Sequence, residues 1–393
     1  MEKNGLEKQN ILHLLEKKLK KDFSYDSGSI LGSMCTEPLD FAKDIYLKYI
    51  SKNLGDPGLF PGTAALEDEL ISEIGDLFGN KNIIGTFTTG GSEANLIAMR
   101  IARNMRSDIK NPEVVVPISA HISFDKAADL LHLRLRKVKL LDNYEVDLHH
   151  YESLINKNTC AVVGVAGTTS LGIVDPIEEI SNLVERKDIF FHIDAAFGGF
   201  VLPFLKRLGY QVPIWDFSVK SVGSITADPH KMGLGIIPTG GYFVKDASIL
   251  QKTGFEIPYL AGGPFKHFHI VGTRPGGSII AFWVILKYLG VNGFNEIVKK
   301  CMDNTEYLVQ RISEIRGIKL AVDPVMNVVG ITTENGVSIC ELEKALRNNN
   351  WMLGKFLDLN LIRVVIMPHV KREHLSNFAV DLEKIVKKLK YNK

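Results

Sequence analysis

Lys231 is the first residue of the sequence that suggests chemistry. It lies in ADPHKMGLG (227–235), directly after SVGSIT, a run that is typical of a buried β-strand rather than of a solvated surface. A lysine that is withdrawn from water gives up its proton more readily, and the neutral amine can attack a carbonyl group to form a Schiff base. We therefore expect a buried, nucleophilic lysine.

Asp194 is the second candidate. It follows the apolar run IFFHI in HIDAAFGGF (192–200), and a buried carboxylate is costly unless it meets a cation or strong donors. In one interpretation the carboxylate caps a nearby turn. In the other it pairs with a protonated ring nitrogen of a cofactor, and the small residues Ala195 and Ala196 leave room for a flat ring.

The segment TTGGSEANLIAMRIAR (88–103) is suited to an anion. Gly-Gly-Ser precedes a clear helical pattern, so free N–H groups and the positive end of the helix dipole would face a bound group, although Gly-Gly-Ser also simply begins helices. The segment matches neither G-x-x-x-x-G-K-[ST] nor G-x-G-x-x-G, which argues against a P-loop or a dinucleotide fold. A phosphate site, a buried acid and a buried lysine together describe a site for pyridoxal 5′-phosphate.

One sheet would position these groups. Between about 83 and 245, helical patterns alternate with the apolar runs VVVPIS, CAVVGVAG, IFFHIDAA, SVGSITAD and GGYFVK. Near-continuous apolar runs predict strands buried on both faces, hence a mainly parallel sheet covered by helices. Ligands of such sheets bind at the carboxyl ends of the strands, where each candidate residue lies.

The other segments predict smaller units. NILHLLEKKLKKDF is typical of an amphipathic helix, YDSGSILGSMC of an irregular segment, and PYLAGGPFKHFHIVGTRPGG of a lid or subunit-contact loop. SIIAFWVILKYLG predicts an apolar helix, and NVVGITT, LIRVVIMPHV and a Lys-rich helix predict a small α+β domain. We expect an N-terminal helical segment (1–50), a large cofactor-binding domain (51–285) and a small C-terminal domain (286–393).

Composition indicates a soluble globular protein of the cytoplasm. The 47 Lys and Arg residues nearly balance the 45 Asp and Glu residues, so the net charge of +2 does not favour nucleic acid. Four cysteines without a C-x-x-C pair favour neither a zinc cluster nor disulfides. The apolar stretch GGSIIAFWVIL meets Lys287 after about a dozen residues, short of the ~20 that cross a bilayer, and MEKNGLEKQN carries no export signal.

Five ordered motifs resemble a known family. TGGSEAN, AHISFDKAAD, GTTSLG, HIDAAFGG and DPHKMG look like the group II pyridoxal-phosphate-dependent decarboxylases, which have the aspartate-aminotransferase fold (fold type I). NLGDPGLFPGT, the PHKMG ending and LIRVVIMPHVKREH are similar to the archaeal L-tyrosine/L-aspartate decarboxylases. The resemblance covers about residues 30–375 and implies an α/β fold with a mainly parallel, seven-stranded-type sheet.

The resemblance implies a role for each matching position. Lys231 resembles the Schiff-base lysine, His230 its neighbour near the phosphate, and Asp194 the partner of the ring nitrogen. Ala196 and His121 match the residues on the two faces of the ring; His121 is otherwise a core histidine. The remaining matches are Gly91 and Ser92 in the phosphate-binding turn, Thr168 beneath the ring oxygen, Thr226 as a further phosphate ligand, Gly272-Thr273 at the partner subunit's phosphate, and the loop residue Tyr259 as proton donor.

Alternatives stay open at several positions. Tyr259 either donates a proton or only packs against the lid, and Arg363 either holds the β-carboxylate of aspartate or forms a surface ion pair at a strand edge. Thr168 and Thr169 are otherwise β-branched strand residues, and His192 is expected to be structural. The pairs His149-His150 and His267/His269 lack acids or cysteines at ligand spacing, so we expect solvated histidines and no metal site.

The resemblance implies an enzyme that decarboxylates an L-amino acid through a Schiff base on Lys231. The substrate is L-tyrosine, giving tyramine for methanofuran, or L-aspartate, giving β-alanine for coenzyme A, in an archaeal cytoplasm. L-Glutamate decarboxylation and an aminotransferase remain alternatives; His121 and the His-Lys pair argue against the latter. An inactive scaffold would have lost Lys231 or Asp194, and both are present. By analogy we expect a homodimer with active sites at its interface.

Overall fold

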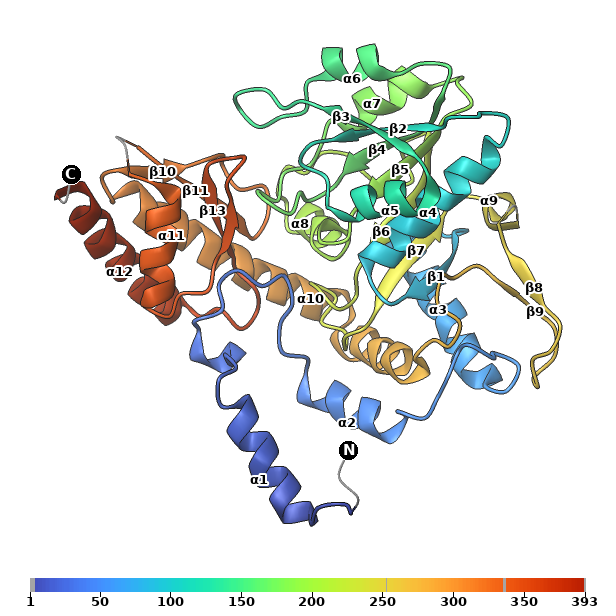
Figure 1. Cartoon of the computed structure of the whole chain (residues 1–393), viewed down its shortest axis with the longest axis horizontal. Coiled ribbons are helices and arrows are strands. Elements are labelled where there is room, and N and C mark those ends of the chain that lie inside the picture. Colours follow the sequence, from blue (N-terminus) through green and yellow to red (C-terminus); the bar gives the residue numbers. More distant parts are fainter. Residues whose placement is uncertain (1–3, 252, 335–336, 392–393) are drawn as a thin grey trace.

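The computed structural model describes residues 4–251, 253–334 and 337–391, which form a large lobe and a small lobe (Figure 1). The large lobe contains a seven-stranded sheet with the order β1-β7-β6-β5-β4-β2-β3. Its strands are β1 (Ile84–Thr88), β2 (Glu113–Pro117), β3 (Arg134–Val138), β4 (Thr159–Val165), β5 (Phe190–Asp194), β6 (Val222–Ala227) and β7 (Gly240–Val244). Only the pairs that include β7 are antiparallel, so the prediction of a mainly parallel sheet is confirmed.

All five apolar runs that predicted strands form strands, and β1 and β3 are additional. β3 was missed because it lies at the edge of the sheet, where RLRKV is partly exposed and carries charges that suit an edge strand. β6 is the strand that directly neighbours β5, with Thr226 opposite Asp194. The segment that follows β6 therefore begins beside Asp194.

Helices cover both faces of the sheet. Val114 and Val116 of β2 face a core that includes α4 (Gly91–Met105) and α5 (Ser123–Leu131). Val115, between them, faces a second core on the opposite side. That second core includes α3 (Pro61–Leu77), α7 (Ile177–Val184) and α8 (Leu202–Arg207), and the short helices α6 (Leu148–Leu154) and α9 (Ala247–Gln251) complete the lobe. The sheet is thus buried on both faces, as its apolar strands require.

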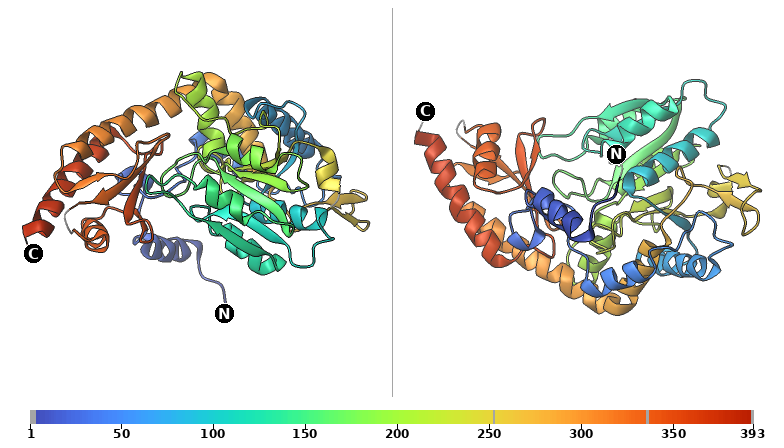
Figure 2. Two further views of the ribbon diagram at one scale, coloured as in Figure 1. Left: turned by 90° about the horizontal axis from the view of Figure 1, so that it is seen from above. Right: turned by 60° about the horizontal axis from the view of Figure 1, so that its bottom comes forward.

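The small lobe is built on a four-stranded antiparallel sheet with the order β10-β11-β13-β12. Its elements are β10 (Ile318–Leu320), β11 (Val328–Thr333), α11 (Ile339–Asn348), β12 (Gly354–Phe356), β13 (Leu361–Val365) and α12 (Arg372–Tyr391). The long helix α10 (Gly276–Ser313) runs between the lobes and contacts α2 and α3 in one and α12 and β10 in the other (Figures 1 and 2). The expected boundary at 285/286 falls inside this helix.

Two segments project from this body. The predicted N-terminal helix forms as α1 (Lys8–Leu19), but none of its residues is buried, and Figure 1 shows it standing away from both lobes. It is followed by the short helices η1 (Tyr25–Ser27) and α2 (Asp40–Lys48). The expected lid contains a two-stranded ribbon, β8 (Phe255–Ile257) with β9 (Phe265–His267), which extends from the large lobe.

α10 is the single helix among the described residues whose length and composition would allow it to cross a membrane. It continues well beyond Lys287, where the apolar run in the sequence ends. However, 44% of its most apolar stretch is buried inside the protein, and it packs on helices of both lobes. These contacts are those of a core helix.

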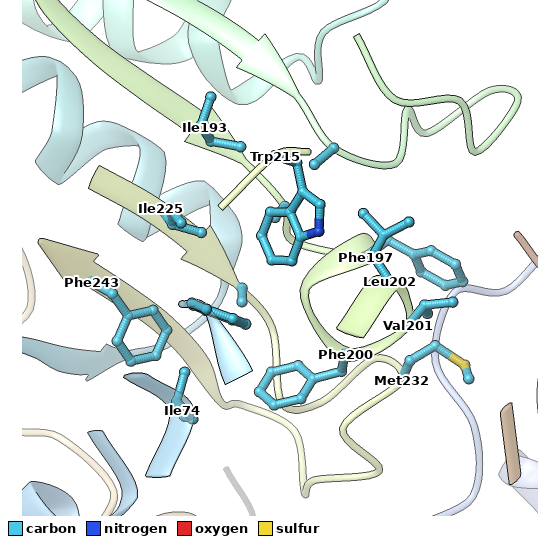
Figure 3. Close-up of a cluster of buried hydrophobic side chains, with 14 of the residues drawn as sticks. Ile74, Ile193, Phe197, Phe200, Val201, Leu202, Trp215, Ile225, Met232 and Phe243 are labelled. Atoms are coloured by element: carbon cyan, nitrogen blue, oxygen red, sulfur yellow. The ribbon is translucent and has the colours of Figure 1, made fainter. Parts of the chain in front are cut away.

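The turn after β6 is anchored by Met232. This side chain is fully buried and belongs to the core on the α3 and α8 side of the sheet. Figure 3 shows Met232 near Phe200, Val201 and Leu202, which follow β5 in the chain. Because its neighbour in the chain is fixed in a packed core, Lys231 has little freedom to leave the edge of the sheet.

A buried acid, Asp175, lies beside the end of β4. Asp175 is 2% exposed, its Oδ2 accepts a 2.7 Å hydrogen bond from the N–H of Val165 at the end of β4, and its Oδ1 has no partner among the described residues. Burial raises the pKa of Asp175 to about 7, and the charge of Asp194 adds to this effect. A raised pKa means that the folded protein binds this proton more tightly than the unfolded chain does.

We predict that this carboxyl group makes the protein less stable as the pH rises from about 4, the ordinary aspartate value, to about 7. The asparagine in Asp175→Asn cannot ionise. The melting temperature of the variant minus that of the native protein should therefore be larger at pH 8 than at pH 5. Melting curves at both pH values test this, with Asp142→Asn, an exposed acid, as the control. An equal difference at the two pH values would contradict the prediction.

Candidate active site

The carboxyl ends of the parallel strands open on a cavity of about 300 Å³. Seven residues singled out from the sequence line it: Gly91, Ser92, His121, Asp194, Ala196, His230 and Lys231. Thr169, Asn95 and Asp228 are also in its wall. The lining does not include Thr168, Thr226, Tyr259, Thr273 or Arg363. The structure therefore brings together the lysine, the acid and the start of the helix, which lie far apart in the sequence.

Asp194 is the last residue of β5 and is 4% exposed. Its Oδ2 accepts a 2.8 Å hydrogen bond from the side-chain amide of Asn95, and its Oδ1 accepts a 3.1 Å bond from the N–H of Ala196. The carboxylate thus caps the turn after β5 and also lies in the cavity wall. Both partners are donors, so each oxygen of the buried carboxylate has a hydrogen bond.

Lys231 lies in the turn after β6, and its side chain is 20% exposed. Lys231 is thus half-buried rather than buried as expected, because the side chain borders the cavity instead of the core. Its Nζ lies 3.2 Å from Oδ2 of Asp228, which is 1% exposed. Oδ1 of Asp228 has no hydrogen-bond partner among the described residues. The cavity wall therefore holds a buried carboxylate whose hydrogen-bonding capacity is only partly used.

Two imidazoles flank this pair. Nδ1 of His121 accepts a hydrogen bond from the N–H of Ser123 (3.2 Å), and Nδ1 of His230 accepts one from the N–H of Thr239 (3.2 Å). Burial lowers the pKa of both histidines, although nearby carboxylates oppose the shift. Each ring is therefore favoured as a neutral imidazole with its proton on Nε2.

The start of α4 forms a close-fitting turn. Gly90 has φ 153°, and a Cβ on Gly91 would lie 2.8 Å from Oδ2 of Asp228. The two glycines therefore let the backbone of the turn approach Asp228 and His230 more closely than a side chain would allow. The first N–H groups of a helix have no partner within it and point outward with the positive end of the dipole, so this turn is suited to a phosphate.

Four of the expected residues lie away from the cavity in this chain. The hydroxyl of Thr168 accepts a hydrogen bond from the N–H of Ile173 (3.3 Å), whereas the next residue, Thr169, lines the cavity. The hydroxyl of Thr226 lies 3.4 Å from Nε2 of His192. Thr273 is exposed, and Tyr259 is 82% exposed on the connection between β8 and β9.

Arg363 of β13 is 7% exposed, so the interpretation as a surface ion pair is wrong. Its guanidinium donates hydrogen bonds to the carbonyl oxygens of Thr169 and Gly32, each at 2.5 Å, and lies over the ring of Phe356. Burial lowers the pKa of Arg363 to about 10. The burial of Arg363 could not be predicted from LIRVVIMPHV, because its partners come from two distant segments.

Of the histidine pairs expected to be solvated, His149 is exposed and His150 half-buried, whereas His267 and His269 differ from expectation. His267 and His269 are buried with ring centroids 4.8 Å apart, so the prediction that they are solvated is wrong. Burial, together with the charge of Arg274, lowers the pKa of His269 to about 2. Within the described ranges, no group of three or more His, Cys, Asp or Glu residues is placed to hold a metal ion.

Sequence reasoning missed Asn95 and Asp228. Asn95 lies one helical turn after Gly91, a spacing that places both on the same side of α4. Asp228 directly follows β6, the same pattern of an acid at the end of an apolar strand that identified Asp194. Both signals were present in the motifs TGGSEAN and DPHKMG.

Comparison with known proteins agrees with this geometry. A family model described as the pyridoxal-dependent decarboxylase conserved domain matches residues 35–332. L-Aspartate/L-glutamate decarboxylase of Pyrococcus horikoshii is 44% identical over 97% of this chain and 98% of its own length. The probable L-tyrosine/L-aspartate decarboxylase of Methanothermobacter thermautotrophicus is 45% identical over 92% of this chain and 98% of its own.

Solved structures share the fold. A sphingosine-1-phosphate lyase of Burkholderia pseudomallei has a TM-score of 0.92 at 24% identity and covers 100% of this chain and 93% of its own. Glutamate decarboxylase of Lactobacillus brevis has a TM-score of 0.90 at 22% identity, covering 99% and 94%. These likenesses confirm fold type I, and the family match confirms a decarboxylase that uses pyridoxal phosphate, not an aminotransferase. The chain belongs to the pyridoxal-dependent decarboxylase family.

Proposed function

We propose that this enzyme removes the α-carboxyl group of L-aspartate or L-tyrosine, with Lys231 as the residue that binds the cofactor. One observation carries the assignment of the site: Lys231 and Asp194 leave adjacent strands, β6 and β5, and border the same cavity. Aspartate occurs in the names of both relatives described above, and tyrosine in one. Glutamate occurs in the other, so it belongs in the tests below.

The side chains present fit pyridoxal phosphate. The glycine turn and Ser92 at the start of α4 would hold the phosphate, with His230 beside it. His121 and Ala196 would contact the two faces of the ring. Thr169, which lines the cavity, replaces Thr168 as the candidate beneath the ring oxygen.

Pyridoxal phosphate supplies, when bound, an electron sink for the electrons that the departing carboxyl group leaves behind. Asp194, whose two oxygens accept N–H groups from the protein and which lines the cavity, would hold a proton on the ring nitrogen. The amine of Lys231, at the edge of the cavity, would hold the cofactor. Asp228 compensates the charge of the ammonium form of Lys231.

Lys231→Ala tests the assignment. The native enzyme should show the visible absorption of a Schiff base and release carbon dioxide from a single amino acid without any keto acid. The variant should lose both, whereas Lys81→Ala, which changes an exposed lysine, should keep both. A variant at Lys231 that keeps the visible band would refute the role of this lysine. Values of kcat/KM for aspartate, tyrosine and glutamate then identify the substrate.

Arg363 is the proposed binding residue for the β-carboxylate of aspartate. Its guanidinium is buried, forms no ion pair with a carboxylate of the described residues, and has an Nε without a hydrogen-bond partner there. It also contacts the backbone of Thr169 in the cavity wall. A buried cation without a counter-charge is costly, and a substrate carboxylate would compensate it.

Arg363→Met is expected to lower kcat/KM for aspartate about 10- to 100-fold, the usual cost of losing a hydrogen bond to a charged group, and to affect tyrosine much less. Steady-state kinetics with both substrates measure the difference, and an unchanged Schiff-base spectrum serves as the control for folding. Equal losses for both substrates would show instead that Arg363 binds the carboxylate that they share.

A homodimer is the proposed assembly. Tyr259 and Thr273 are exposed and lie outside the cavity of their own chain, which supports roles in the site of a partner subunit, Tyr259 as proton donor and Thr273 at the phosphate. The apolar side chains of α1 support a partner as well, because Ile11, Leu12 and Leu15 are each about half exposed.

The double variant Leu12→Glu/Leu15→Glu is expected to weaken the dimer, because it places charges on the apolar side of α1. Light scattering should show a shift toward the monomer mass of 43.7 kDa together with a loss of activity. His13→Glu, on the opposite side of the helix, is the matched control. A native enzyme that is monomeric and fully active would contradict the dimer, and a double variant that stays dimeric would exclude α1 from the interface.

The proposed physiological role follows from the substrate. The relatives named above are archaeal proteins. We place the enzyme in the cytoplasm, where β-alanine would enter coenzyme A biosynthesis and tyramine would enter methanofuran biosynthesis. The ratio of kcat/KM for aspartate to that for tyrosine decides between these two roles.

A further inference from the structure

A chain of buried polar side chains leads away from Asp194 behind the cavity. Oδ1 of Asn95 lies 3.0 Å from Nε2 of His192, and Nδ1 of His192 lies 2.8 Å from the hydroxyl of Ser224. All four side chains are at most 4% exposed. They come from α4, β5 and β6, so the chain of contacts joins the helix that begins at the glycine turn to two central strands.

The direction of each hydrogen bond is fixed by chemistry. A carboxylate can only accept, so Asn95 must turn its NH₂ group toward Asp194 and its oxygen toward His192. Nε2 of His192 must then carry a proton, which leaves Nδ1 to accept from Ser224 if the ring is neutral. Burial lowers the pKa of His192 to about 4, which keeps the ring neutral near pH 7.

We infer that Asn95 and His192 are positioning residues that hold the carboxylate of Asp194 aimed at the cofactor. If Asn95 rotated by half a turn, its oxygen would face the carboxylate and its NH₂ group would face a ring N–H, so both contacts would become repulsive. His192 and Ser224 thus lock the amide in the orientation that donates to Asp194. The inference rests on the proposed pairing of Asp194 with the ring nitrogen.

The second hydrogen of the same amide group strengthens this assignment. Nδ2 of Asn95 also donates to the hydroxyl of Ser123 at 2.9 Å, so both of its hydrogens and its oxygen are used. Ser123 in turn gives its N–H to His121, which lines the cavity. One side chain therefore connects the acid that faces the ring nitrogen with the turn that carries His121.

Asn95→Leu keeps the approximate volume and removes every hydrogen bond of the amide. We expect it to weaken pyridoxal phosphate binding to the cofactor-free enzyme about tenfold or more, since a hydrogen bond to a charged group is lost. The visible absorption of the reconstituted enzyme should shift or weaken, and kcat should fall more than KM rises. Asn304→Leu, which removes a buried asparagine of α10 that donates to Val370, controls for general loss of packing and should keep the affinity.

His192→Leu should weaken cofactor binding less than Asn95→Leu, because it only frees the amide to rotate. In the double variant the loss should equal that of Asn95→Leu alone, since His192 acts through Asn95. If the losses of cofactor affinity of the two single variants multiplied in the double variant, the inference that His192 acts through Asn95 would be refuted. Asn95→Asp is a second variant that keeps the shape; a second carboxylate against Asp194 should weaken cofactor binding more than leucine does.

Asp194→Asn, measured in parallel, distinguishes a failure of the positioning role from a failure of the proposed pairing between Asp194 and the ring nitrogen. If it abolishes tight cofactor binding while Asn95→Leu and Asn95→Asp bind normally, the positioning role is refuted and the proposed function stands. If Asp194→Asn itself binds the cofactor as the native enzyme does, the pairing with the ring nitrogen is refuted. Weaker binding by all three variants, with native affinity in Asn304→Leu, is the expected result.

Discussion

A carboxylate withdrawn from water has to be surrounded by donors, and in this protein that requirement organises the active site. Asp194 receives N–H groups from Asn95 and Ala196, one from a helix and one from the turn after its own strand. The helix must therefore begin close to the strand end, and this brings the glycine turn to the same place. The positions of the acid and of the glycine turn are consequences of one packing arrangement.

The parallel sheet brings the other residues of the site together. Parallel strands end on the same side, so residues at or after the ends of β2, β5 and β6 meet, although the first and last of them are about 110 positions apart in the chain. His121, Asp194 and Lys231 are these residues. The buried Met232 then keeps the lysine at the edge of the sheet. Catalytic geometry thus depends on strand direction more than on any local sequence pattern.

The sequence allowed much of this to be predicted, because apolar runs and acids at strand ends are local signals. Five strands, Lys231 and Asp194 were found in this way. The failures involve partners from distant segments: Arg363 is buried against Thr169 and Gly32, and His269 is buried beside Arg274. The edge strand β3 lacked an apolar run because it is not fully buried. Roles assigned by resemblance, such as that of Tyr259, stay predictions.

The helix shared by the two lobes has a mechanical consequence. α10 is interrupted at Gly290, whose backbone (φ 54°, ψ −170°) is accessible essentially only to glycine. Beyond this residue Phe294 still stacks on Phe204 of α8 in the large lobe, and only Leu308 and Ile312 further along pack in the core of the small lobe. The kink therefore lies within the large lobe, and the stretch of α10 that passes from one lobe to the other is an uninterrupted helix, which resists bending between them.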